Sequence, residues 1–138
     1  MEPTLILSDA ARSTAGTLLL TILFVEFGGL YVLRLVPGRQ AATPFQKTFA
    51  RAGHAHAGVL VSLGLIIQIF ADAVALEGLI ASVARSGVPL AAILMPAGYF
   101  LSSAGKGATE PNRFFVLIYA GAVSLAAGVT ALGIGLLA

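Results

Sequence analysis

The stretch STAGTLLLTILFVEFGGLYVL, residues 13–33, lies between Arg12 and Arg34 and carries one charged residue, Glu26. A helix needs about 20 apolar residues to cross the hydrocarbon core of a bilayer, which is about 30 Å thick. The stretch therefore predicts a membrane-spanning helix with a single carboxylate inside it.

Three further stretches of similar length carry no charge at all. They lie between Arg51 and Asp72, between Arg85 and Lys106, and from Arg113 to the C-terminus. Only 10% of the 138 residues are charged and 58% are hydrophobic, whereas about a quarter of the residues in soluble domains are charged. The composition predicts an all-α integral membrane protein, a four-helix bundle in one transmembrane domain, with almost nothing left for a soluble domain.

Proline and glycine mark the expected helix ends. The motifs are PGRQAA after the first stretch, Thr43 followed by Pro44, RSGVP at residues 85–89, and GKGATEPN before the fourth stretch. These signals predict helices at about 13–36, 44–84, 88–104 and 111–137. Pro96 is expected to kink the third helix.

The chain contains a possible tandem repeat of two helical hairpins. TPFQKTF at residues 43–49 and TEPNRFF at 109–115 share Thr, Gln or Asn, Lys or Arg, and Phe at one offset. The same offset places Gly58 and Ser62 on Ser124 and Gly128. Small residues four apart allow membrane helices to approach closely. The repeat predicts parallel hairpins whose second and fourth helices pack through these residues, although a chance match is an open alternative.

The basic residues suggest an orientation in the membrane. Six flank the two connectors expected between helices one and two and between helices three and four: Arg34, Arg39, Lys47, Arg51, Lys106 and Arg113. The opposite side has only Arg12 and Arg85. The positive-inside rule then places both connectors in the cytoplasm and both termini outside, in the cell (inner) membrane. The net charge of +2 indicates lipid-headgroup anchors and no nucleic-acid partner.

The only two histidines, His54 and His56, lie in GHAHAG at residues 53–58. Glu26 and His54 are both about 14 residues from the connector centre near residue 40, so a helical hairpin predicts that they lie at one depth. Ionisable groups at membrane depth usually face the bundle interior. We therefore expect Glu26, His54 and His56 as candidate ligands of a divalent metal, and the histidines as candidate haem ligands.

The two histidines should nevertheless point about 200° apart on a regular helix. One helix cannot aim both at one ion, which leaves one axial haem ligand, two separate sites, or a site between subunits. A purely structural role for the two histidines is also open, because a histidine near a membrane interface often buries its ring and exposes only the polar ring edge to water. A polar line of Ser62, Gln68 and Asp72 along the second predicted helix could serve as an ion path.

Three functional hypotheses follow from these residues. The first is a membrane site for a metal, haem or proton. The second is a channel or carrier for ions or small solutes, and the third is an accessory subunit of a larger membrane complex. The sequence contains no zinc-protease, nucleophile-elbow, phosphate-loop or dinucleotide motif, so an enzyme is less expected. The bilayer is one expected partner, and copies of the same chain or other subunits are the others.

Overall fold

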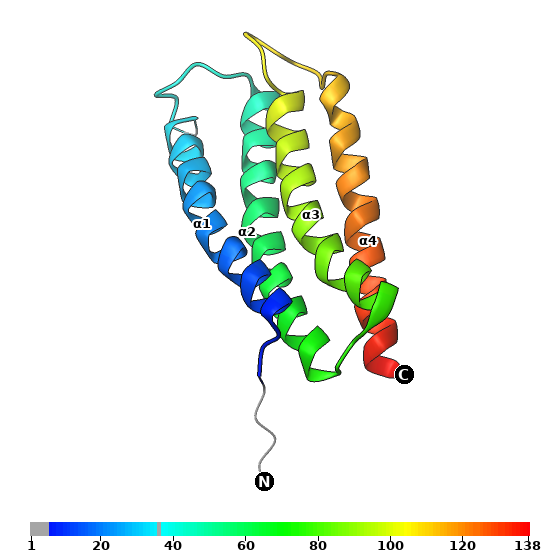
Figure 1. Ribbon diagram of the computed structural model, residues 1–138. Coiled ribbons are helices and arrows are strands. Elements are labelled where there is room, and N and C mark those ends of the chain that lie inside the picture. The colour runs from blue at the N-terminus through cyan, green and yellow to red at the C-terminus, as the bar shows by residue number, and fades with distance from the viewer. Residues whose placement is uncertain (1–5, 36) are drawn as a thin grey trace.

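Four helices lie side by side in the computed structural model, which describes residues 6–35 and 37–138 (Figure 1). They are α1 (Asp9–Leu35), α2 (Pro44–Ala73), α3 (Gly78–Ser102) and α4 (Val116–Leu137), and the short 3₁₀ helix η1 (Arg113–Phe115) precedes α4. Each is long and apolar enough to cross a membrane, α4 together with η1. Within these described ranges there is no strand. The predicted all-α membrane bundle of four helices is confirmed.

The first connector matches its sequence signals. Thr43 caps α2 by accepting a hydrogen bond from the Gln46 amide, and the Gln46 side chain accepts one from the Thr43 amide. This reciprocal capping box, with Pro44 in the first turn, favours a helix start at that point. The predicted start of α2 is confirmed, while α1 begins at Asp9, earlier than expected. The predicted end of α1 at Val36 lies outside the described residues.

The predicted boundary between the second and third helices is wrong. Helix α2 ends at Ala73 instead of near residue 84, and α3 already begins at Gly78. The intervening turn uses a left-handed backbone at Ala75 (φ 50°) and at Gly78 (φ 66°). Alanine is a weak turn signal, which explains the error. The RSGVP motif lies inside α3 and does not end a helix, and α3 contains both Pro89 and Pro96. Membrane helices tolerate proline because neighbouring groups can compensate for the missing amide hydrogen bonds.

The closest helix contact is between α3 and α4. A Cβ added at Gly87 would lie 2.7 Å from the Gly128 Cα atom, and the Ser124 hydroxyl donates a 2.8 Å hydrogen bond to the Gly87 carbonyl. The predicted packing of Ser124 and Gly128 against Gly58 and Ser62 is therefore wrong. Gly58 approaches α1 instead, and Ser62 is exposed.

Both connectors lie at the same end of the bundle, which we call the connector end (Figure 1). The Thr43 hydroxyl donates a hydrogen bond to the Ala108 carbonyl. The Nε2 atom of the Gln46 side chain donates to the carbonyls of Ser103 and Gly105, at 3.0 and 2.7 Å. These bonds join the two connectors to each other. The opposite end, where α1 begins and α4 ends, is called the termini end.

Candidate ligand site at His54

A cavity of about 250 Å³ lies between α1, α2 and α3. Its walls are almost entirely apolar, and they include Val25, Ala57, Val61 and Pro96. Helix α1 also contributes Thr21, whose hydroxyl already donates a 2.7 Å hydrogen bond to the Thr17 carbonyl. The cavity's one titratable side chain is that of His54.

Two glycines of α1 make room for the imidazole ring of His54. A Cβ added at Gly29 would lie 3.0 Å from the His54 Cε1 atom, and one added at Gly28 would lie 3.6 Å from Nδ1. The first distance is tighter than normal carbon contacts, whereas the second is an ordinary van der Waals contact. The adjacent pair Gly28–Gly29 thus allows α1 to pack directly on the ring, which the sequence analysis had not anticipated.

The Nδ1 atom of His54 is buried and has no hydrogen-bond partner among the described residues. Buried polar atoms in proteins are nearly always paired, and an unpaired one needs an explanation such as a bound molecule. A ring nitrogen can accept a proton, donate one in a hydrogen bond, or ligate a metal. The His54 ring therefore packs its Nδ1 side against Gly28 and Gly29 and brings one imidazole to the wall of an otherwise apolar space.

Glu26 does not join this site. Its side chain is exposed on the surface of the bundle, so the prediction that it faces the interior beside His54 is wrong. Its height is close to the expected one, because Gly28 and Gly29 contact His54 and lie less than one helical turn from Glu26. Val25 faces the cavity, and the next residue points about 100° away from it.

His56 points away from the cavity, and the predicted divergence of the two histidines is confirmed. Its Nδ1 atom donates a 2.7 Å hydrogen bond to the Ala52 carbonyl, and its ring packs against Tyr99 of α3 with 4.9 Å between centroids. Across residues 6–35 and 37–138, no three His, Cys, Asp or Glu side chains gather closely enough to hold a metal ion. The expected set of Glu26, His54 and His56 is therefore not assembled within one chain.

The expected polar line along α2 is interrupted. Ser62 is exposed and donates to the Gly58 carbonyl, whereas Gln68 is completely buried and donates a 2.9 Å hydrogen bond to the Arg85 carbonyl of α3. Asp72 also turns toward α3. The three side chains do not share one face, so the prediction of a continuous ion path along them is wrong.

Asp72 forms a partly buried polar cluster at the termini end, which was not predicted from the sequence. Its carboxylate, only 6% exposed, pairs with the Arg85 guanidinium at 2.5 Å. It also accepts hydrogen bonds from the amide and the hydroxyl of Ser8, at 2.8 and 2.9 Å. The Ser8 hydroxyl in turn accepts from the Ala11 amide at the start of α1. A serine directly before Asp9 is a helix-start signal that could have located one member of the cluster.

Comparison of the chain with protein-family models, curated proteins and solved structures found no match.

Proposed function

We propose that this protein is a small integral membrane protein that binds a small, mainly apolar ligand at His54. The observation that carries the proposal is the half-buried imidazole of His54, the one titratable side chain that lines an otherwise apolar cavity. Ligand sites typically combine hydrophobic walls with very few polar groups, which fix the ligand's orientation. An unpaired buried polar atom costs about 1–3 kcal/mol, so a ligand that supplies its partner gains affinity.

The size of the cavity limits the ligand. At about 250 Å³ it lies below the range of roughly 300–1,000 Å³ typical of drug-sized ligands. A single aromatic ring or a short aliphatic molecule with one hydroxyl group matches this space. A haem needs more room, and a divalent metal needs ligands beyond the single imidazole, so a hydrogen-bonded ligand is favoured over both. The interrupted polar line likewise favours binding over conduction.

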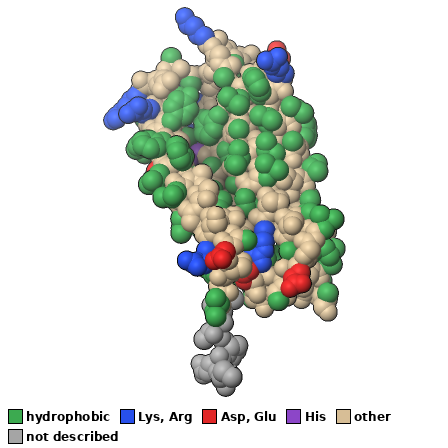
Figure 2. All heavy atoms as spheres, in the orientation of Figure 1, with side chains coloured by type: hydrophobic (Ala, Val, Ile, Leu, Met, Phe, Trp, Pro, Cys, Tyr) green, Lys and Arg blue, Asp and Glu red, His purple; other side chains and the backbone are tan. Residues whose placement is uncertain are grey.

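The proposed orientation places the connector end in the cytoplasm. Basic residues at this end include Arg34, Lys106 and Arg113, whereas the termini end holds Arg12 and Arg85 together with acidic residues (Figure 2). This asymmetry supports the positive-inside arrangement in a cell membrane. The ligand cavity would then lie in the cytoplasmic half of the bilayer.

Binding can be tested with phenol as the probe and benzene as its match without a hydroxyl. The full chain, labelled with ¹⁵N-histidine, is placed in lipid nanodiscs, where His54 and His56 give the only labelled side-chain signals. Phenol should shift the His54 signal in a saturable way and leave the His56 signal unchanged. It should bind about threefold to tenfold more tightly than benzene, which corresponds to one neutral hydrogen bond.

Two variants complete this test. His54→Phe should remove the preference for phenol over benzene, whereas His56→Phe should keep it. A phenol shift that is absent, or equal at both histidines, would rule out the proposed site. An absorption spectrum of the same preparation should show no haem band, and a metal analysis should show less than one metal ion per chain. If a haem band or a bound metal is found and is lost in His54→Phe, the haem or metal hypothesis replaces the proposal.

A further inference from the structure

The His54 cavity opens sideways on the surface of the bundle. Two of its lining residues, Phe24 of α1 and Ile93 of α3, are also 74% and 64% exposed. Helices α1 and α3 both pack on α2 but make few contacts with each other. A groove therefore lies between them over α2, and the space-filling view shows histidine atoms in a hollow beside α1 (Figure 2).

Toward the connector end, an aromatic pair closes the cavity. Phe100 packs edge-on against Tyr31 of α1, with 6.3 Å between ring centroids and 63° between ring planes. Beyond this pair lies a separate pocket of about 430 Å³, to which Gln40, Gln46 and Ser103 contribute. Phe100 lines both spaces. The polar pocket at the connector end and the apolar His54 cavity are thus divided by these two rings.

The surroundings of the two openings differ in kind. The lateral opening has an apolar rim in the middle of two helices that are each long enough to span a bilayer, so it faces acyl chains when the protein is in a membrane. The connector-end pocket lies beside loops and hydrogen-bonding side chains, as expected next to water. A molecule crossing the lateral rim does not need to leave the hydrocarbon, whereas a charged molecule would be strongly disfavoured there.

We infer that the ligand of His54 is an uncharged, hydroxyl-bearing molecule dissolved in the bilayer, which enters laterally between Phe24 and Ile93. This inference rests on the proposed function and specifies the chemical class of the ligand. It also assigns Phe24 and Ile93 to the entrance, and Phe100 to the wall that separates the cavity from the connector-end pocket.

The entry route can be tested with two para-substituted phenols, whose binding is followed by the ¹⁵N signal of His54. A para-alkylphenol with a long acyl-like tail can place its ring on His54 only if the tail leaves the cavity through the lateral opening. The anionic 4-hydroxybenzenesulfonate stays in water and can approach only from the bundle ends. The alkylphenol should shift the His54 signal, and the sulfonate should not.

A covalent obstruction of the entrance, added after the protein has folded, gives the second arm. The natural chain has no cysteine, so Ile93→Cys can be folded first and then modified with a bulky maleimide. Modification should weaken alkylphenol binding at least tenfold, whereas modification of Val59→Cys, an exposed position outside the cavity lining, should not change it. Comparing each protein before and after modification excludes a folding defect.

The outcomes separate this inference from the proposed function. If phenol binds at His54 but the alkylphenol does not, or if the sulfonate binds, the ligand site stands and the lateral route is wrong. Unchanged binding after modification of Ile93→Cys would also overturn the route. If phenol itself fails to shift the His54 signal, the proposed function fails, and the inference fails with it.

Discussion

His54 and Glu26 illustrate what residue spacing can and cannot predict. Counting outward from the connector placed the two near one height, because antiparallel helices pair residues at equal distances from their turn. Direction around each helix was a separate question. On α2 the pattern around His54 correctly separated the two histidines, but nothing in the first stretch indicated that Gly28 and Gly29, and not Glu26, would face α2.

At this scale, the clearest test of the site's geometry is a pair of single-methyl additions. Gly29→Ala should displace the His54 ring, because the new Cβ would lie 3.0 Å from Cε1. Gly16→Ala, on the same helix, should have little effect, because its Cβ would have no atom within 4 Å. We expect phenol affinity to fall severalfold in Gly29→Ala only, measured by the same titration of the His54 signal. Equal losses in both variants would contradict the described packing.

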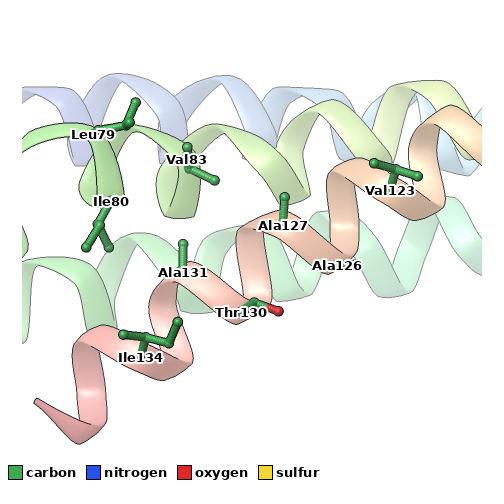
Figure 3. Close-up of a pocket in the computed structure, with 9 residues that line it drawn as sticks. All are labelled: Leu79, Ile80, Val83, Val123, Ala126, Ala127, Thr130, Ala131 and Ile134. Carbon is green, nitrogen blue, oxygen red and sulfur yellow. The ribbon is translucent and has the colours of Figure 1, made fainter.

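Among the elements, α3 and α4, parts of which are drawn side by side in Figure 3, form the most closely packed pair, and the reason lies in their glycines. Gly128 was correctly predicted to be a packing residue, but its predicted neighbour was wrong, because a short apparent repeat cannot identify which helices touch. The turn between α2 and α3 was missed for a related reason. Its left-handed position is occupied by Ala75, whereas the stronger breaker motif, RSGVP, lies inside a helix.

The α3–α4 contact predicts a large effect from one methyl group. In Gly87→Ala the new Cβ would lie 2.7 Å from the Gly128 Cα atom, and backbone must move to accommodate it. Overpacking of this kind costs about 1–3 kcal/mol. Gly133→Ala adds the same methyl group to α4 with no atom within 4 Å. Thermal unfolding in detergent should show a lower Tm for Gly87→Ala and an unchanged or higher Tm for Gly133→Ala.

The Asp72 cluster connects three helices and should respond to mutation as a unit. Asp72→Ala leaves the partly buried Arg85 guanidinium without its partner, and the loss of a hydrogen bond between charged groups typically costs about 1.5–3 kcal/mol. The double variant Asp72→Ala/Arg85→Ala should recover part of this loss. Glu77→Ala, at an exposed position nearby, serves as the control. Free energies of unfolding in detergent would be measured for the wild type, both single variants (Asp72→Ala and Arg85→Ala), the double variant and the control. Single losses that add up to the loss of the double variant would contradict the coupling.

For the molecule as a whole, composition alone predicted the class correctly, because four long apolar stretches leave few other ways to bury their surface. Orientation and assembly depend on the surroundings of the chain and stay predictions. Homo-oligomer formation is one of these. The exposed carboxylate of Glu26, on a helix with few buried residues, is consistent with a partner on that surface but does not identify it.

The orientation can be measured directly, since the chain contains no cysteine. In Lys106→Cys the thiol should be protected from a membrane-impermeant reagent in intact spheroplasts and should react in inverted vesicles. Asp9→Cys, at the termini end, should show the reverse pattern. Labelling of both positions from the same side would contradict the four-span arrangement, and a complete reversal would contradict only the proposed cytoplasmic placement of the connectors.

The way α1 is attached affects the range of ligand sizes that the His54 cavity can accept. This helix is fixed at its start by Ser8 on Asp72, packs mainly on α2, and is followed by a connector in which Gly38 has a left-handed backbone (φ 75°). A small tilt of α1 about its attached N-terminal end would widen or narrow the gap to α3 and leave the α3–α4 contact intact. Ligands of different widths would then fit the cavity with little loss of packing among the other three helices.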